Sequence, residues 1–220
     1  MARASLTTRR LLGLDRSGPP PAETLSGQPL HPWTIPNAIG FTRIALIPVF
    51  LALALNSGDG RTASASILYA VVGGTDYLDG IAARVTGQYS RLGALLDPIT
   101  DRLLVLSGAA VCWRFDLLPR WALAVLAARE LFMLVLSRMA MRRGIELEIK
   151  MLGRWAVWPT MFSLFLAMLS TTWVAEALLY FGLALTLWAT GQYVRDGWPK
   201  IRSAPKSSRK PPGEGPSSSG

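Results

Sequence analysis

The sequence predicts an all-α, polytopic integral membrane protein with six transmembrane helices. Half of its 220 residues are apolar and only 17% are charged, so the chain is too hydrophobic for an ordinary soluble domain of this length. Apolar runs recur between two polar tails, and they approach the roughly 20 residues that an α-helix needs to cross the hydrocarbon core of a bilayer. A formal net charge of +9 on such a chain favours a membrane over a nucleic acid as its surroundings.

Two polar tails flank one membrane domain. Residues 1–33 are rich in Pro, Gly, Ser and Arg and contain no apolar stretch long enough for the core of a signal peptide. Residues 196–220 are basic and rich in Ser and Pro. Neither segment can bury enough apolar surface to offset its conformational entropy. We therefore expect two disordered cytoplasmic tails around a membrane domain at 34–195.

Six apolar runs justify the six helices in chain order. The first run contains Arg43, and the second is uncharged until Asp76. The third carries two further aspartates, the fourth carries Arg129 and Glu130, and the fifth follows a basic connection. The sixth ends where the basic tail begins. The predicted spans are 38–55, 62–83, 92–113, 121–141, 155–175 and 177–194.

The positions of lysine and arginine predict the orientation, because cytoplasmic loops retain these residues. Eighteen of the 23 basic residues belong to the tails or adjoin the connections between the second and third and between the fourth and fifth spans. Only Arg61, Arg114 and Arg120 belong to the opposite connections. We expect both termini on the cytoplasmic side of the plasma membrane. A soluble nucleic-acid-binding protein is disfavoured, because the basic residues form no continuous face.

Four aspartates within a short stretch carry the functional signal. On one predicted helix, a single stripe holds two carboxylates and two small residues, and on the next helix a stripe holds a glycine and two carboxylates. The residues at these positions are Asp76, Asp79, Gly80 and Ala83, and then Gly93, Asp97 and Asp101. A carboxylate at membrane depth costs about 2.5–3.5 kcal/mol on insertion scales, so four of them indicate a functional site.

The chemistry of these residues indicates a site for two divalent cations. Four neighbouring carboxylates repel one another unless cations neutralise them. Oxygen ligands favour Mg²⁺ or Mn²⁺ over zinc, and the single Cys112 and single His31 exclude cysteine-rich metal sites and most histidine-based mechanisms. Two metals clamp the entering and leaving oxygens in a displacement at phosphorus, so we expect phosphoryl or phosphatidyl transfer.

The complete pattern resembles the signature of a known family. Asp76-x2-Asp79-Gly80-x2-Ala83-Arg84-x8-Gly93-x3-Asp97-x3-Asp101 matches the signature of the CDP-alcohol phosphotransferase (CDP-alcohol phosphatidyltransferase class I) family without gaps. The similarity covers about residues 36–194. It implies a six-helix membrane fold, a homodimer, and an active site that opens at the cytoplasmic membrane surface.

The resemblance also implies a reaction and the residues that perform it. An acceptor alcohol, deprotonated by Asp101, attacks the lipid-linked phosphate of CDP-diacylglycerol and releases CMP. The implied metal ligands for Mg²⁺ or Mn²⁺ are Asp76, Asp79, Asp97 and Asp101. The implied CDP-binding residues are Gly80, Ala83, Arg84, Gly93 and Asn37.

The acceptor alcohol is less clearly indicated. IPNAIGFTRIALIPVF and the Arg129-Glu130 pair are similar to bacterial phosphatidylglycerophosphate synthases and related cardiolipin synthases. Where phosphatidylglycerophosphate synthases carry Gly-Lys-x-Lys-Thr, this chain has Gly153-Arg154-Trp155-Ala156-Val157, with one basic residue fewer. Glycerol 3-phosphate ranks first as acceptor, phosphatidylglycerol close behind, and inositol phosphate third. The candidate acceptor-binding residues are Arg129, Arg138, Lys150 and Arg154.

Other interpretations compete with parts of this prediction. Close helix packing also explains glycines such as Gly73, Gly74 and Gly108, and Arg43 and Arg129 could snorkel or pair with Glu130. For the whole chain, the alternative is a cation-coupled membrane transporter, which would also carry intramembrane carboxylates. A transporter would usually show repeated halves, and the sequence contains no second copy of the aspartate pattern.

Overall fold

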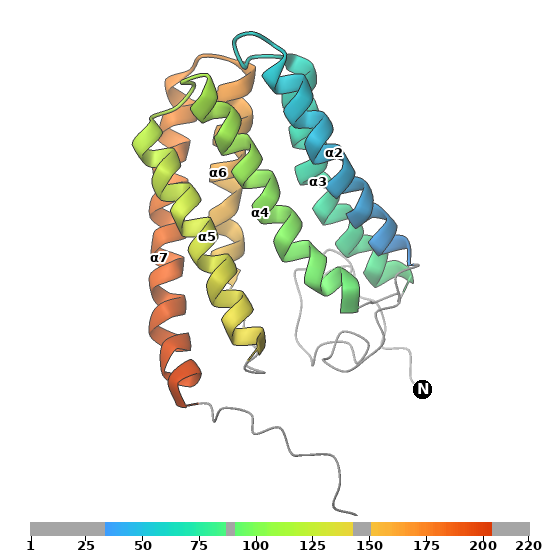
Figure 1. Cartoon of the computed structure of the whole chain (residues 1–220), viewed down its shortest axis with the longest axis vertical. Coiled ribbons are helices and arrows are strands. Elements are labelled where there is room, and N and C mark those ends of the chain that lie inside the picture. Colours follow the sequence, from blue (N-terminus) through green and yellow to red (C-terminus); the bar gives the residue numbers. More distant parts are fainter. Residues whose placement is uncertain (1–33, 87–90, 143–150, 204–220) are drawn as a thin grey trace, which may run out of the picture.

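The computed structural model describes residues 34–86, 91–142 and 151–203, and within these ranges the chain forms six α-helices and no strand (Figure 1). For some residues inside the helices it describes the backbone alone. The helices are α2 (Ile35–Leu55), α3 (Ala63–Thr86), α4 (Arg91–Arg114), α5 (Arg120–Arg142), α6 (Met151–Leu169) and α7 (Trp173–Ser203). The prediction of an all-α fold is confirmed.

The helices form an up-and-down bundle around α4, which contacts α2, α3, α5 and α6. Short connections join α2 to α3, α4 to α5 and α6 to α7 at one end of the bundle, at the top of Figure 1. The opposite end holds the start of α2, the end of α3, the start of α4, and the ends of α5 and α7. We call this second end the site end, because the aspartate-bearing halves of α3 and α4 lie there.

Local signals fix the first helix and the connection that follows it. Thr34 caps α2, since its hydroxyl oxygen accepts the Asn37 backbone N–H at 3.4 Å, and Pro36 lies in the first turn, where a missing N–H costs nothing. In the loop after α2, Gly60 has φ +75°, and a Cβ there would lie 2.5 Å from the ring of Phe115. Glycine is required at this position for both reasons.

The predicted boundaries differ most from the structure at the last pair of helices. The fifth span was placed at 155–175 and the sixth at 177–194, whereas α6 ends at Leu169 and α7 begins at Trp173. The reason is the Ser170-Thr171-Thr172 segment, because such residues favour helix starts over helix interiors. At its other end α7 continues to Ser203, beyond the domain boundary expected at residue 195. The two predicted tails otherwise lie outside the described residues.

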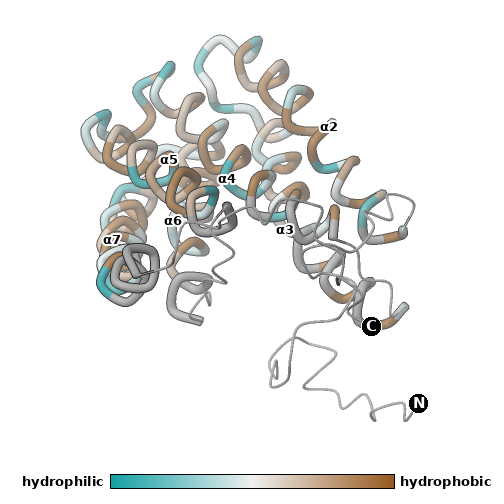
Figure 2. The backbone as a smooth tube through the Cα atoms, turned by 60° about the horizontal axis from the view of Figure 1, so that its bottom comes forward, coloured by the Kyte–Doolittle hydropathy of each residue, from teal (hydrophilic) through white to brown (hydrophobic). Residues whose placement is uncertain are grey.

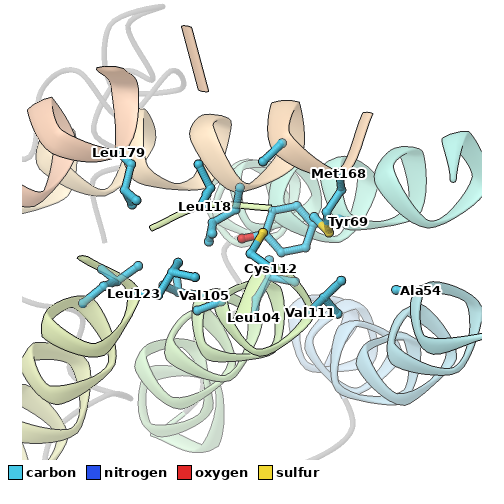
Figure 3. Close-up of a cluster of buried hydrophobic side chains, with 14 of the residues drawn as sticks. Ala54, Tyr69, Leu104, Val105, Val111, Cys112, Leu118, Leu123, Met168 and Leu179 are labelled. Carbon is cyan, nitrogen blue, oxygen red and sulfur yellow. The ribbon is translucent and has the colours of Figure 1, made fainter. Parts of the chain in front are cut away.

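One large apolar core, part of which Figure 3 shows, lies mostly in the half of the bundle away from the site end. The rings of Phe50 and Tyr69 meet there with centroids 5.2 Å apart. Every helix contributes, and representative members are Ala54, Tyr69, Leu104, Cys112, Leu123, Met168 and Leu179. A smaller cluster on α5, at Met133 and Leu136, packs against Tyr193 and Val194 of α7. The site half contains a different kind of interior, with buried charged side chains on α2 and α5.

Large apolar side chains are exposed on every helix, and Figure 2 shows that hydrophobic residues recur along the described helices. The exposed side chains include Phe41, Ile67, Leu103, Phe132, Trp158 and Trp188. Within the part of the chain that the structure describes, two helices are long and apolar enough to cross a membrane, at Asn37–Leu55 and Trp173–Arg195. Two shorter apolar helices lie at Ala63–Thr75 and Ala156–Leu169. A surface of this kind suits contact with lipid better than contact with water.

Candidate active site

The aspartate pattern occupies two half-helices that lie at the same end of the bundle. Asp76 and Asp79 belong to the second half of α3, and Asp97 and Asp101 belong to the first half of α4. The two helices contact each other and run in opposite directions (Figure 1). The backbone thus brings the two predicted stripes to one region. The side chains of Asp76, Asp79, Gly80, Ala83 and Arg84 lie outside the described residues.

Asp101 forms a direct ion pair with Arg43. The Arg43 Nη2 lies 2.7 Å from Asp101 Oδ1, and the Arg43 Nε donates to the backbone carbonyl of Val72 at 3.3 Å. The side chain of Arg43 is only 1% exposed, whereas that of Asp101 is 44% exposed. The buried Arg43 guanidinium therefore links α2, α3 and α4, and it binds the Asp101 carboxylate from the interior of the bundle.

The remaining described residues of the α4 stripe are partly buried. Gly93 and Asp97 are half-buried in the first two turns of the helix, and each makes contacts in the structure. Thr100 is buried, and its hydroxyl donates to the Leu96 carbonyl at 3.0 Å. The polar groups of this half-helix are thus held in place by the helix itself and by its neighbours.

A second set of charges joins α4 to α5 and α7. The Arg102 Nη1 donates to Glu130 Oε2 at 2.8 Å, and Arg129 forms a short ion pair with Glu130 Oε1. The Arg129 Nε then donates to Thr190 Oγ1 on α7 at 3.0 Å. The side chains of Arg129 and Glu130 are about 95% buried. The proposed pairing of Arg129 with Glu130 is confirmed, whereas Arg43 pairs with Asp101 instead.

The structure separates the other candidate binding residues. Asn37 is buried in the first turn of α2, at the site end. Arg138 is exposed on the last turns of α5. Lys150 lies outside the described residues, and Arg154 lies on α6 with a side chain that is not described. Of the four candidate acceptor residues, Arg129 alone has a described environment of buried polar contacts.

Sequence reasoning missed Arg102 and Glu130 as a pair, and it missed the partner of Arg43. Their residues are 28 and 58 positions apart along the chain, respectively, so no local spacing connects them. The sequence did contain one signal, which is the presence of charged residues inside apolar runs, where a charge needs a buried partner. That signal identifies Arg43, Arg129 and Glu130 as residues of interest without saying how they pair.

The chemistry of the four predicted ligands is that which hard divalent cations prefer. They are oxygen donors on two contacting helices at one end of the bundle, and the described member Asp101 is accessible. Among the described side chains, no group of three His, Cys, Asp or Glu residues gathers into a metal site. Half of the predicted ligand set, Asp76 and Asp79, lies outside those side chains, so the assignment of all four ligands stays a prediction.

A family model and several curated relatives agree on one family. The family model for CDP-alcohol phosphatidyltransferase matches residues 33–188. A cardiolipin synthase (CMP-forming) from Streptomyces coelicolor is 39% identical over 167 residues, which cover 73% of this chain and 77% of the relative. A CDP-diacylglycerol–glycerol-3-phosphate 3-phosphatidyltransferase from Bacillus subtilis is 32% identical over 57% of this chain and 72% of the relative. A protein with the same name from Pseudomonas fluorescens is 30% identical over 77% of this chain and 92% of the relative.

Proposed function

Because this chain belongs to the CDP-alcohol phosphatidyltransferase family, we propose that it transfers the phosphatidyl group of CDP-diacylglycerol to an acceptor alcohol in phospholipid biosynthesis. The observation that carries the proposal is the placement of Asp97 and Asp101 on α4 beside the aspartate-bearing half of α3. The names of the relatives support the same class of enzyme. A cation-coupled transporter would not account for this family match.

In the proposed reaction, Asp101 takes the proton of the acceptor hydroxyl. The acceptor oxygen then attacks the lipid-linked phosphorus, the bond from that phosphorus to the bridging oxygen of the pyrophosphate breaks, and CMP leaves. Arg43 is a positioning residue, because its guanidinium holds Asp101 Oδ1 at 2.7 Å. A carboxylate with an ordinary pKa is a weak base near neutral pH, so its placement matters more than its intrinsic basicity.

The remaining family residues bind the substrate and the metal ions. We propose Asp76, Asp79, Asp97 and Asp101 as ligands of Mg²⁺ or Mn²⁺, which when bound would stabilise the negative charge that develops on the phosphate oxygens. Small residues let the backbone approach the CDP group closely, and Arg84 supplies a cation for its phosphates. The proposed CDP-binding residues are Gly80, Ala83, Arg84, Gly93 and Asn37.

Two acceptors fit, and each is favoured by a specific observation. Glycerol 3-phosphate is favoured by the relatives from Bacillus subtilis and Pseudomonas fluorescens, whose names specify it. Phosphatidylglycerol, which would give cardiolipin, is favoured by the higher identity to the Streptomyces coelicolor protein. Ala156 also favours phosphatidylglycerol, since it is a buried neutral residue where phosphatidylglycerophosphate synthases usually carry a second lysine.

Product analysis tests the function and identifies the acceptor. The purified protein, in liposomes with CDP-diacylglycerol and Mg²⁺ or Mn²⁺, should release CMP when glycerol 3-phosphate or phosphatidylglycerol is supplied. The lipid product, phosphatidylglycerophosphate or cardiolipin, identifies the acceptor by chromatography. Chelation by EDTA should stop CMP release, and added Mg²⁺ or Mn²⁺ should restore it. Failure to release CMP with every acceptor, in the presence of either metal, would contradict the proposed function.

We also propose that all six helices cross the plasma membrane, with both termini and the active site on the cytoplasmic side. The alternating direction of the helices supports this, because it places the connections that hold Arg61, Arg114 and Arg120 at the end opposite the site. The apolar side chains exposed on each helix support it as well. Family resemblance supports a homodimer as the working assembly.

A further inference from the structure

The described ion pairs of the site half contain one more arginine than they contain carboxylates. Arg43 pairs with Asp101, while Glu130 pairs with both Arg102 and Arg129. The other acidic residues of the site, Asp76, Asp79 and Asp97, are assigned to divalent cations together with Asp101. A buried charge without a counter-ion is costly. The extra positive charge between α4 and α5 therefore indicates that an anion binds there.

Arg102 is the group with capacity left for that anion. Its Nη1 is held by Glu130, but its Nε is buried and has no hydrogen-bond acceptor among the described residues. Glu130 does not satisfy it in this structure, where Oε2 accepts from the Arg102 Nη1 and Oε1 from Arg129. The Arg102 side chain is 16% exposed, so it is buried less deeply than the side chains of Arg129 and Glu130. Guanidinium groups bind phosphate oxygens through such N–H donors.

The positive charge of Arg102 and Arg129 lies where the phosphate of an acceptor alcohol could bind. Arg102 directly follows Asp101, the proposed base, and Arg129 and Glu130 lie on α5, which contacts α4. An anion bound here would lie one residue along α4 from the carboxylate that receives the hydroxyl proton, on the face of α4 that contacts α5. Both candidate acceptors have this chemistry, because each joins a phosphate to a hydroxyl through the three carbons of glycerol.

We propose that Arg102 and Arg129, both held by Glu130, form the subsite for the phosphate of the acceptor alcohol. Thr190 completes the support from α7, since it accepts the Arg129 Nε hydrogen bond at 3.0 Å. The inference rests on the proposed function and deepens it by adding Arg102 and Glu130, with the carboxylate as the residue that positions both arginines. The phosphate is a monoester in glycerol 3-phosphate and a diester in phosphatidylglycerol.

Steady-state kinetics of the full-length protein in liposomes test the subsite. In Arg102→Gln, the KM for the acceptor should rise about tenfold or more, as expected for a lost charge-assisted hydrogen bond, while the KM for CDP-diacylglycerol stays unchanged. Arg102→Lys keeps the charge but loses the planar guanidinium, so its KM for the acceptor should rise less than that of Arg102→Gln. Arg114→Gln is the matched control, because Arg114 is an exposed arginine at the opposite end of the same helix.

A binding measurement provides a readout that needs no turnover. Thermal unfolding in detergent would be followed with glycerol 3-phosphate and with glycerophosphoglycerol, the head group of phosphatidylglycerol without its acyl chains. The head group of the true acceptor should raise the Tm of the wild type and of Arg114→Gln, but raise that of Arg102→Gln much less. Comparison of the two ligands shows whether the subsite takes a monoester or a diester.

The outcomes separate the subsite from the function on which it rests. If Arg102→Gln lowers the Tm but leaves both the acceptor KM and the ligand-induced shift unchanged, Arg102 only joins the helices and the subsite is wrong. If the wild type releases no CMP with either acceptor, the proposed function fails on its own. Should Arg102→Gln not fold, Arg102→Lys decides the matter, because an unchanged acceptor KM and ligand-induced shift in that variant would contradict the subsite.

Discussion

The ion pair between Arg43 and Asp101 fixes the position of the carboxylate that we propose as the general base. Arg43 is almost completely buried and uses two N–H groups, one on Asp101 and one on the Val72 carbonyl of α3. Asp101 is far more exposed. The carboxylate is thus held from the protein interior while it remains accessible from outside, an arrangement that suits a group that must receive a proton from a substrate.

Asp101→Asn should abolish turnover while the fold stays intact. The amide has nearly the same shape as the carboxylate but cannot take the proton from the acceptor hydroxyl, and general-base catalysis typically contributes about 10²–10⁴-fold. CMP release measures the loss, and circular dichroism with thermal unfolding checks the helices. Substantial residual CMP release by a folded Asp101→Asn protein would remove Asp101 from this role.

Arg43→Gln should lower kcat by about tenfold to a hundredfold, the equivalent of one lost charge-assisted hydrogen bond of about 1.5–3 kcal/mol. The acceptor KM should change little, because Arg43 acts through Asp101 and does not contact the acceptor. Arg43→Lys keeps the charge and should recover part of the activity. A fall in Tm with unchanged kcat in Arg43→Gln would show that this arginine supports only the fold.

At this scale the sequence predicted which residue types matter better than it predicted their partners. The aspartate spacing places Asp97 and Asp101 on one face of a helix, and the structure has both on α4. Pairings such as Arg43 with Asp101 depend on how α2 packs against α4, which no local pattern encodes. The same holds for Arg102 and Glu130, whose helices must first be adjacent before their charges can meet.

Among the elements, α6 and α7 pack most closely where a glycine faces a backbone. A Cβ at Gly182 on α7 would lie 2.8 Å from the backbone nitrogen of Thr160 on α6. Backbone cannot move aside as a flexible side chain can. Small residues at such contacts let membrane helices approach each other closely, so Gly182 serves the packing of this pair of helices.

Gly182→Val should therefore destabilise the protein by about 1–3 kcal/mol, the usual cost of inserting a side chain into a well-packed interface. Gly191→Val is the matched control, because Gly191 lies on the same helix with open space around its Cα. Thermal unfolding of both variants in detergent measures the effect. Equal Tm values for the two variants would contradict close packing at Gly182.

Helix existence was predictable from hydrophobic run length, but boundaries depended on weaker signals. Gly73 and Gly108 show the packing role expected of small residues, since a Cβ at either would lie within 3 Å of a side chain on another helix. Gly74 does not, because nothing lies within 4 Å of its Cβ position. The end of α6 was missed because the apolar run continues with Trp173 and Val174 beyond the polar turn, so hydropathy alone could not locate it.

On the scale of the whole molecule, the large apolar core and the buried ion pairs occupy different parts of the bundle. The large core clusters around Tyr69 and Cys112, while the pairs of Asp101 and Glu130 lie near the middle of α4 and α5. The connections that hold Arg61, Arg114 and Arg120 lie at the end opposite the site. A bundle organised in this way suits an enzyme that meets water-soluble and lipid substrates at one membrane surface.

Cysteine labelling tests this orientation in intact cells. The native Cys112 is fully buried, so it should contribute little background with a membrane-impermeant maleimide. Thr171→Cys, in the connection between α6 and α7, should react from outside the cell. Ser203→Cys, at the end of α7, should react only after the membrane is made permeable. The reverse pattern would show that the active site faces away from the cytoplasm.

The central helix α4 fixes the position of the proposed catalytic residues relative to the apolar core, because it contributes to both. Its first half carries Asp97 and Asp101, and its second half supplies Leu104, Val111 and Cys112 to the core. Each residue of an α-helix advances about 1.5 Å and turns about 100°. A one-residue insertion between Asp101 and Leu104 would therefore rotate the carboxylates away from α3 while the core stayed packed. Length changes in α4 should be far less tolerated than changes of similar size in the tails.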